Sequence, residues 1–324
     1  MSSAIQKIGE IIAANRAPIS FADFVDFALY DPEFGYYKRP RKRIGFDRET
    51  DFYTATSTGE VFAELVVAAA EKLLKPDLPG DFTFLEIGAE PNSGILPAKH
   101  IFAESKVIRH GESIEFPEKT VFFSNELFDA QPFHRLVFSK NKWREIGIDW
   151  RNELVEVELA ELSKPVAAIA DRLPKSIAEG YHLDLPIASA DLLRKFTSAS
   201  NWQGLLILFD YGKSWREMIE ATPQGTARAY HRHRQSNDLL AMPGEQDLTC
   251  HICWDWLIEV LEKSGFREIK LQSQEAFFIT EATSAIEKII SEKPGEFDRR
   301  RQTIQQLIHP GQMGQKFQVL TARR

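Results

Sequence analysis

The sequence predicts an α/β fold built on a mostly parallel sheet, with added antiparallel strands and a helical amino-terminal segment. Three short apolar runs, 82–87, 120–123 and 204–209, carry this prediction because buried parallel strands read as continuous hydrophobic stretches. Polar residues follow each run, and a turn glycine follows the first and the third. In open α/β sheets, ligands bind outside the carboxyl ends of the strands. We therefore expect the functional residues at these three ends.

The length and composition indicate a large, ordinary globular chain. It has 324 residues, of which 43% are hydrophobic and 27% charged. We expect residues 1–324 to form a single elaborated domain. Within it, a helical segment (1–80) precedes a sheet core (81–140 and 200–324), and the core is interrupted by an inserted hairpin and helices (141–199).

The charge balance argues against nucleic acid and anionic membranes as partners. The formal net charge is −7 and the pI about 5.7, and no aromatic-basic platform is evident. The basic stretch 38–43 is typical of a solvated loop. A run of about 18 apolar residues, which a membrane span would need, is absent. The amino terminus resembles neither a secretory signal nor a transit peptide, so we expect a cytoplasmic protein.

Two cysteines, Cys250 and Cys253, are too few for a disulfide framework and favour a reducing compartment. Their C-x-x-C spacing lacks the second Cys/His pair that a structural zinc requires. Because Trp254-Asp255-Trp256 follows, we expect buried structural thiols beside a core helix, and no metal site.

Apolar residues at helical spacing predict the first helix over residues 4–15. Ser20 starts a second one, with Asp23 in the capping-box position, and this helix ends before Pro32. A hydroxyl-rich loop at 50–57, which includes Thr54, then leads into a helix with its apolar face between residues 62 and 74. The hydroxyls either cap this helix or face a ligand at its amino terminus.

The strand at 82–87 ends in Glu86 and Gly88, but a G-x-G-x-x-G fingerprint does not follow it. From Glu86 to Asn125 there is room for barely one crossover, so we expect an abbreviated linker between them. Further along the chain, periodicity and turn residues predict several elements. They are hairpin strands added to the sheet over 136–159, helices 165–177 and 188–196, a long irregular segment 213–249, a helix 254–263 closed by Gly265, strands 268–271 and 276–280, a helix 284–292 and a final strand 316–320.

The segment after the second strand, residues 124–134, concentrates polar groups at a strand end. Asn125, Glu126 and Asp129 fall within five positions. Such residues also favour caps and turns, so a loop that merely satisfies backbone groups is the alternative.

Several segments, in the same order along the chain, together resemble the MidA-like S-adenosylmethionine-dependent methyltransferases. This family includes the mitochondrial arginine methyltransferase that assists complex I assembly. The matching motifs are D-P-x-x-G-Y-Y at 31–37, the loop 50–57, N-E-x-x-D-A-x-P at 125–132, D-Y-G at 210–212, G-x-x-x-x-Y at 225–230, P-G-x-x-D-L-T-x-H at 243–251 and M-G-x-x-F-x-V-L at 313–320.

The resemblance implies a class I methyltransferase-like (Rossmann-like) fold, S-adenosylmethionine as cofactor, and methylation of a protein arginine. It implies Glu126 and Asp129 as catalytic carboxylates that bind the guanidinium. The cofactor-binding residues that it implies are Glu86, Gly88, Asn125 and Thr54, with Asp210 as a further candidate. An arginine-bearing protein is the implied partner, and a homodimer is left open.

The chain departs from the family pattern at the cofactor motif. Its glycine motif is degenerate after Gly88, and Thr50 and Thr56 replace a glycine and a proline of the loop. We expect the short interval 89–119 to have lost the second strand of the family, whose acidic end would hold the ribose hydroxyls, and Glu104 to be only a weak substitute. The alternative function is therefore an inactive methyltransferase-fold protein that serves as a binding or assembly factor.

Overall fold

The computed structural model describes residues 3–39, 43, 50–51, 59–89, 94–199, 201–291 and 299–324. The chain forms two compact units, and it passes between them five times. The first unit comprises residues 1–52, 128–192 and 212–257, and the second comprises residues 53–127, 193–211 and 258–324. The predicted organisation as a single elaborated domain stays a prediction, and each unit is described by itself.

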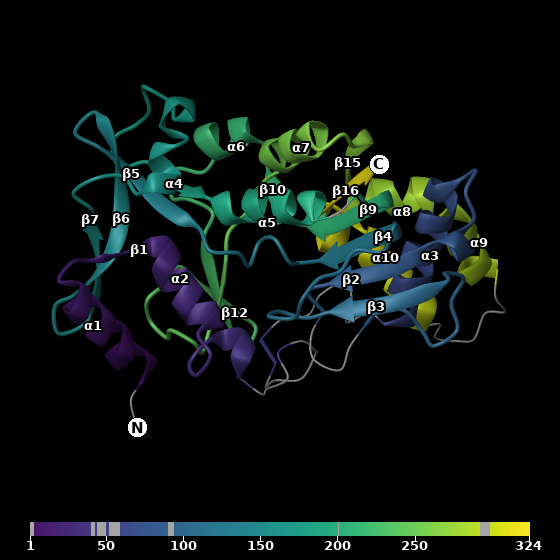
Figure 1. Ribbon diagram of the computed structural model, residues 1–324, viewed down its shortest axis with the longest axis horizontal. Helices are drawn as coiled ribbons and strands as arrows, with labels where there is room; N and C mark the ends of the chain where they lie inside the picture. The colour runs from purple at the N-terminus through teal and green to yellow at the C-terminus, as the bar shows by residue number, and fades with distance from the viewer. Residues whose placement is uncertain are drawn as a thin grey trace. The chain divides into compact units, whose positions relative to one another are not determined.

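The second unit contains a six-stranded sheet with the order β15-β16-β9-β4-β2-β3 (Figure 1). Four neighbouring strands, β9, β4, β2 and β3, are parallel, and β16 and β15 continue the sheet antiparallel. The predicted mostly parallel sheet with added antiparallel strands is thus confirmed. The strands are β2 (Thr83–Ile87), β3 (Glu104–Ile108), β4 (Lys119–Asn125), β9 (Gln203–Asp210), β15 (Arg267–Ser273) and β16 (Gln318–Arg323).

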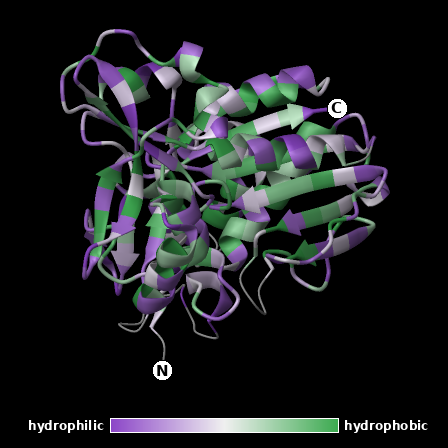
Figure 2. Cartoon of the chain, turned by 60° about the vertical axis from the view of Figure 1, so that its left-hand side comes forward, coloured by the Kyte–Doolittle hydropathy of each residue, from purple (hydrophilic) through white to green (hydrophobic). Residues whose placement is uncertain are grey.

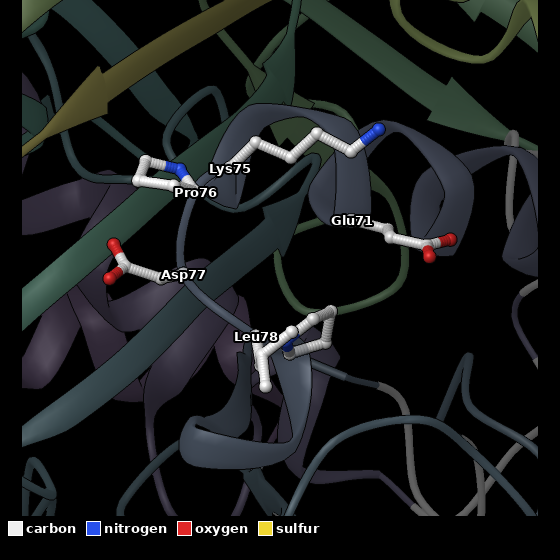
Figure 3. Close-up of a pocket in the computed structure, with 6 residues that line it drawn as sticks. Glu71, Lys75, Pro76, Asp77 and Leu78 are labelled. Atoms are coloured by element: carbon white, nitrogen blue, oxygen red, sulfur yellow. The ribbon is translucent and has the colours of Figure 1, made fainter.

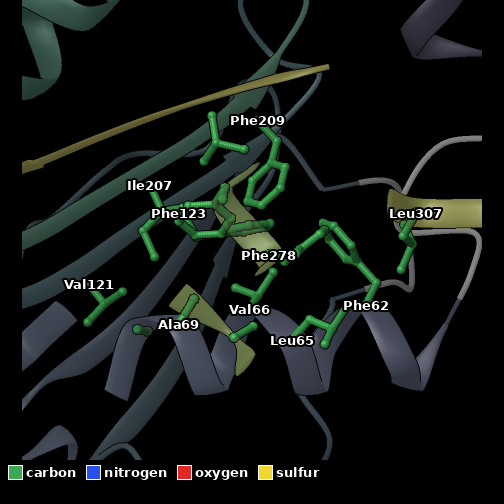
Figure 4. Packing of buried hydrophobic residues seen from close by; sticks show 14 of the residues in the cluster. Phe62, Leu65, Val66, Ala69, Val121, Phe123, Ile207, Phe209, Phe278 and Leu307 are labelled. Atoms are coloured by element: carbon green, nitrogen blue, oxygen red, sulfur yellow. The ribbon is translucent and has the colours of Figure 1, made fainter. Parts of the chain in front are cut away.

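One face of this sheet is covered by α3 (Glu60–Leu74), α8 (Gln274–Glu281), α9 (Thr283–Ser291) and α10 (Arg299–Ile308). Figure 4 shows Phe62 of α3 and Phe278 of α8 against Phe123 and Phe209 of the sheet. The rings of Phe62 and Phe209 lie 5.3 Å apart. Because Phe62 belongs to the first turn of α3 and Phe209 lies near the end of β9, α3 begins close to the carboxyl edge of the sheet.

The first unit has a five-stranded antiparallel sheet of its own, in which β7 pairs with β6 beside the path β1-β6-β5-β8. Figure 2 shows hydrophobic and polar residues interspersed along its strands, as expected for a sheet with one buried face. The other strands pair as β12-β11-β13 and β10-β14. The elements are β1 (Ile19–Ser20), β5 (His134–Ser139), β6 (Lys142–Trp150), β7 (Leu154–Glu158), β8 (His182–Leu185), β10 (Gly212–Lys213), β11 (Arg228–His231), β12 (Arg234–Ser236), β13 (Asp247–Thr249), β14 (Ile252–Cys253), α1 (Ala4–Asn15), α2 (Phe21–Tyr30), α4 (Lys164–Ala167) and α6 (Trp215–Glu220), while α5 (Ile187–Ser198) and α7 (Trp254–Lys263) belong partly to each unit.

Capping residues in the sequence predicted several helix ends correctly. The Ser20 hydroxyl accepts the backbone N–H of Asp23 at 3.1 Å, and the Asp23 carboxylate accepts the Ser20 N–H at 3.3 Å, so the predicted capping box is confirmed. Gly265 follows α7 with φ +80°, as expected of a left-handed cap. The N-cap of α3 is Gly59, which has no side chain to cap it. Thr54 lies outside the described residues.

Four predictions of secondary structure were wrong. The helix predicted over 165–177 is limited to the single turn of α4 and a 3₁₀ turn at Ala170–Arg172. The hairpin strands over 136–159 do not join the parallel sheet, because they pair with β1 and β8 in the first unit. Residues 276–280 form helix α8, whose start is fixed by the Ser273 hydroxyl accepting the Ala276 N–H at 3.2 Å. The segment 213–249 is not irregular, since it contains α6 and the strands β11 to β13.

Candidate active site at the carboxyl ends of β2 and β4

The order of the parallel strands indicates where a ligand would bind in the second unit. The chain runs from β2 to its neighbour β3 on one side, and then to β4 on the other side of β2. Such a reversal of strand order is where ligands bind in open α/β sheets, outside the carboxyl ends of the strands. Glu86 and Gly88 stand at the end of β2, and Asn125 and Glu126 at the end of β4.

Strand register places Glu86 and Asn125 on the same face of the sheet. Glu86 pairs with Phe123 of β4, and Phe123 belongs to the core under α3. Side chains alternate along a strand, so Asn125, two positions after Phe123, shares that face. Because α3 begins near this edge, the two polar side chains stand where the apolar core ends.

Glu86 has a buried carboxylate that binds the backbone of Ile95. The residue is 5% exposed, and its Oε2 accepts the backbone N–H of Ile95 at 2.8 Å. Burial raises the pKa of Glu86, while the Ile95 hydrogen bond and the positive charge of Arg109 act in the opposite direction. The Glu86 carboxylate therefore holds the backbone of Ile95 through this hydrogen bond.

Gly88 brings the backbone of β2 close to its neighbours. Its φ is +89°, and its N–H donates to the carbonyl of Ile108 at 2.9 Å, one step beyond the end of β2. A Cβ at this position would lie 2.8 Å from Cδ1 of Leu127. Both the backbone conformation and the close approach of Leu127 therefore require glycine here.

Asn125 and Glu126 are held by specific hydrogen bonds at the end of β4. The Asn125 amide Nδ2 donates to Glu126 Oε1 at 2.9 Å, and the Glu126 N–H donates to the Phe209 carbonyl at 2.9 Å. Glu126 has φ +52°, a left-handed conformation that is unfavourable for a residue with a Cβ. Strain of this kind persists where surrounding contacts impose it, and it clusters at functional sites.

Asn125 also carries a buried acceptor. Among the described residues no group donates a hydrogen bond to its side-chain oxygen Oδ1. A buried amide oxygen without a partner costs about 1–3 kcal/mol, so this atom is suited to accept a donor from a ligand.

Asp129, the second predicted carboxylate, belongs to the first unit. It is 3% exposed, and its backbone carbonyl accepts the N–H of Cys250 at 2.9 Å. Tyr30 and Tyr37 stack with ring centroids 5.5 Å apart, and their pKa values are raised well above normal by burial first and then by the charge of Asp247, with Asp129 adding to the effect. Asp129 therefore contributes to an acidic and aromatic cluster of the first unit.

The structure thus brings Glu86, Gly88, Asn125 and Glu126 together at one edge of the sheet. Asp210 ends β9 at the same edge, fully buried, and its Oδ1 accepts the Tyr211 N–H at 2.9 Å. Thr54 falls outside the part of the chain that the structure describes. The roles predicted for these residues stay predictions.

The sequence reasoning missed β3, which was expected to be lost from the abbreviated linker. This strand pairs in parallel with β2 along its full length. The expected substitute acid, Glu104, begins β3 and lies about 13 Å from its carboxyl end, so that prediction was wrong. The residue that follows β3 is Arg109. The apolar pair Val107-Ile108 was the available signal for a short edge strand.

A surface pocket lined by Glu71, Lys75, Pro76, Asp77 and Leu78 lies elsewhere (Figure 3). It flanks the end of α3, about 22 Å along the helix from its start. The following residues lead into the amino end of β2, so this pocket is at the opposite edge of the sheet. We assign it no role in the site.

Both cysteines are buried free thiols, and burial raises their pKa, to about 12 for Cys253. Among the described residues there is no group of three or more His, Cys, Asp or Glu side chains arranged to hold a metal. Within the same part of the chain, no helix is both long and apolar enough to cross a membrane.

Comparison with known proteins gives a consistent result. A family model described as "putative S-adenosyl-L-methionine-dependent methyltransferase" matches residues 70–271. The mitochondrial protein arginine methyltransferase NDUFAF7 of Xenopus laevis is 26% identical over 204 residues, which cover 62% of this chain and 45% of that protein. The chain therefore matches somewhat less than half of this relative. The Drosophila melanogaster homolog is 22% identical over 370 residues, covering 94% of this chain and 82% of the relative.

A crystal structure from Burkholderia thailandensis, bound to S-adenosyl-homocysteine, superimposes with a TM-score of 0.84. The superposition covers 98% of this chain and 91% of that one at 22% sequence identity. At this identity the likeness concerns the fold, and it confirms the methyltransferase-like α/β architecture predicted from the sequence.

Proposed function

The chain belongs to the family of putative S-adenosyl-L-methionine-dependent methyltransferases, and on that premise we propose that it transfers a methyl group from S-adenosylmethionine to an arginine side chain of a protein. The observation that carries the proposal is the pair Asn125–Glu126 at the carboxyl end of β4, beside the reversal of strand order. The arginine specificity is drawn from the names of distant relatives.

The residues at this edge fit such a cofactor. The buried Oδ1 of Asn125 offers an acceptor for the ammonium of the cofactor's amino-acid end. Gly88 is exposed at the end of β2, where its backbone would border the nucleoside of the cofactor. When bound, S-adenosylmethionine supplies an electrophilic methyl group attached to a sulfonium.

Glu126 is the residue that we assign to the arginine. A carboxylate accepts two parallel N–H bonds from a guanidinium, which fixes the plane of the acceptor nitrogen and compensates its charge. The hydrogen bonds from Asn125 and to Phe209 hold Glu126 before substrate arrives, so alignment requires little reorganisation. Asp129 as second carboxylate remains part of the family-based expectation, and the proposal rests on Glu126.

A specific observation favours the alternative of an inactive binding or assembly factor. Arg109, rather than an acid, follows β3, the strand next to β2. In doubly wound folds an acid at this place accepts the ribose hydroxyls of the nucleoside. Without this acid, one expected contact with the cofactor is missing. The methyltransferase and the inactive factor therefore differ in whether the chain binds the cofactor.

Calorimetric titration of the full chain with S-adenosylmethionine and S-adenosyl-homocysteine separates the two functions. We expect binding by the wild type, and Asn125→Ala to weaken it by about tenfold, the value of one hydrogen bond to a charged group. Glu126→Gln should leave the affinity within about threefold. Absence of binding by the wild type would favour the inactive alternative and end the proposal.

Catalysis is tested with methyl-labelled S-adenosylmethionine and a protein extract, followed by amino-acid analysis for labelled methylarginine. Glu126→Gln should lower the rate by about 10²–10³, as for the loss of one aligned electrostatic group. Glu118→Gln is the matched control, because Glu118 precedes the opposite end of β4 and is exposed. Label in another amino acid would refute arginine as acceptor, and an unchanged rate in Glu126→Gln would refute the role of that residue.

A further inference from the structure

The hairpin formed by β11 and β12 (residues 228–236) concentrates positive charge in the first unit. It contains three arginines and two histidines, and no aspartate or glutamate. His231 pairs with Arg234 across the hairpin, so Arg232 and His233 form its turn, with φ of 47° and 60°. The three consecutive residues from Arg232 to Arg234 are exposed. In a chain with a formal net charge of −7, this hairpin is a local exception.

Contacts within the first unit hold the turn of this hairpin in place. The buried residue Asp51 accepts the N–H of Arg232 with its Oδ1 at 2.8 Å, and its backbone carbonyl accepts the N–H of His233 at 2.8 Å. The Thr50 hydroxyl lies 3.0 Å from Nε2 of His233. Because the turn is fixed before a partner arrives, less conformational entropy is lost when one binds.

The guanidinium groups of Arg232 and Arg234 take no part in these contacts. Neither forms an ion pair or a side-chain hydrogen bond with any residue in the part of the chain that the structure describes. Glu245 is an exposed acid beside the hairpin, since its carbonyl lies 3.0 Å from Nδ1 of His231, but its carboxylate is paired with Arg39 at 3.4 Å. The fold therefore leaves two exposed guanidinium groups for another molecule.

We propose that the β11–β12 hairpin is a docking surface for an acidic segment of a partner protein. A guanidinium binds a carboxylate through two parallel N–H bonds, and two such groups two positions apart match carboxylates spaced along a peptide. A nucleic acid is disfavoured because its dense phosphate charge would extend beyond the hairpin and meet a chain of negative net charge. The inference goes beyond the proposed function, because the hairpin binds its partner whether or not the chain methylates that partner.

Fluorescence anisotropy on the full chain tests the inference with three labelled probes of equal length: an oligoglutamate, a glycine-serine peptide and an oligothymidylate. We expect the oligoglutamate to bind the wild type with a dissociation constant below about 1 mM and to bind more weakly as salt is added. The uncharged glycine-serine peptide should not bind, because it offers no carboxylate to the arginines.

Two double variants measure the contribution of the arginines. Arg232→Gln with Arg234→Gln should weaken oligoglutamate binding by about two- to thirtyfold, since each exposed ion pair contributes a factor of about 1.4 to 5. Arg232→Glu with Arg234→Glu should abolish binding, because like charges then face the probe. The midpoint of urea denaturation should stay unchanged in both, because neither side chain has a partner to lose among the described residues.

The hairpin between β5 and β6 supplies the matched control. Its turn residues, Lys140 and Asn141, have φ of 53° and 59°, and Lys140 and Lys142 are exposed cations two positions apart. This turn includes an exposed acid, because the N–H of Lys140 donates to Oε1 of Glu179 at 2.8 Å. Lys140→Gln with Lys142→Gln removes the same charge from the same unit, and should leave oligoglutamate binding unchanged.

Three results would overturn the inference: no binding of oligoglutamate by the wild type, equal binding of the glycine-serine peptide, or equal losses in the arginine and lysine double variants. Tighter binding of oligothymidylate than of oligoglutamate would also overturn it, in favour of a nucleic-acid surface. None of these results depends on S-adenosylmethionine. Failure of the docking surface is therefore distinguishable from failure of the proposed function.

Discussion

Replacing Gly88 by alanine tests whether the turn after β2 must come as close to Leu127 as the structure indicates. The substitution has two costs. A residue with a Cβ at φ +89° loses about 1–2 kcal/mol. The new Cβ would lie 2.8 Å from Leu127 Cδ1 and 3.3 Å from Leu127 Cβ, and displacing a packed side chain costs about 1–3 kcal/mol. We therefore expect the free energy of unfolding to fall by about 2–5 kcal/mol.

Urea denaturation of the full chain measures this loss, and Gly265→Ala separates its two parts. Gly265 has φ +80° in the same unit, and a Cβ there would meet no atom within 4 Å. Gly265→Ala should therefore cost only about 1–2 kcal/mol. In the double variant Gly88→Ala with Leu127→Ala, the 2.8 Å contact with Leu127 Cδ1 is removed, so the two substitutions should couple by about 1–3 kcal/mol. Equal losses for Gly88→Ala and Gly265→Ala, or zero coupling, would refute the reasoning.

Three further predictions concern strain, pH and capping. Glu126→Gly replaces a residue with a Cβ in the left-handed conformation, so the free energy of unfolding measured with urea should be unchanged or up to about 1 kcal/mol higher. Methyl transfer should be lost. A marked loss of stability would contradict the inference that Glu126 is strained. Burial lowers the pKa of His251 to about 4, so the folded state stays neutral while the unfolded chain binds a proton below about pH 6.5. The free energy of unfolding should then fall by about 3 kcal/mol between pH 6.5 and 4, and His251→Gln should remove that part of the slope; an identical slope would contradict it. Ser20→Ala should cost about 1 kcal/mol in thermal unfolding because the capping box of α2 is lost, and an unchanged midpoint would argue against that cap.

Sequence patterns were sufficient wherever the determining interactions are local. The buried strands β2, β4 and β9 read as apolar runs, because both of their faces are covered. The capping box at Ser20 and the glycine cap after α7 involve residues a few positions apart, and both were predicted correctly. The family was also evident from the order of its motifs.

Tertiary structure decided which strands share a sheet. The hairpin over 136–159 has the same alternation whether it joins the parallel sheet or the sheet of the first unit, because its partners β1 and β8 are distant in sequence. The run 276–280 is apolar enough for a strand, but packing of Phe277 and Phe278 against the core under α3 selects a helix. Short apolar runs are ambiguous between helix and strand for this reason.

For the site, the sequence by itself determined that Glu86, Asn125 and Glu126 stand at strand ends, because each follows an apolar run. Only the tertiary structure decided that the Glu86 carboxylate binds the backbone of Ile95, that Glu126 is strained, and that β3 is present and is followed by Arg109. A five-residue edge strand buries too little to leave a clear hydrophobic pattern, and its register exists only through hydrogen bonds to β2. The charge at that edge therefore depends on strand pairing, which a linear pattern does not contain.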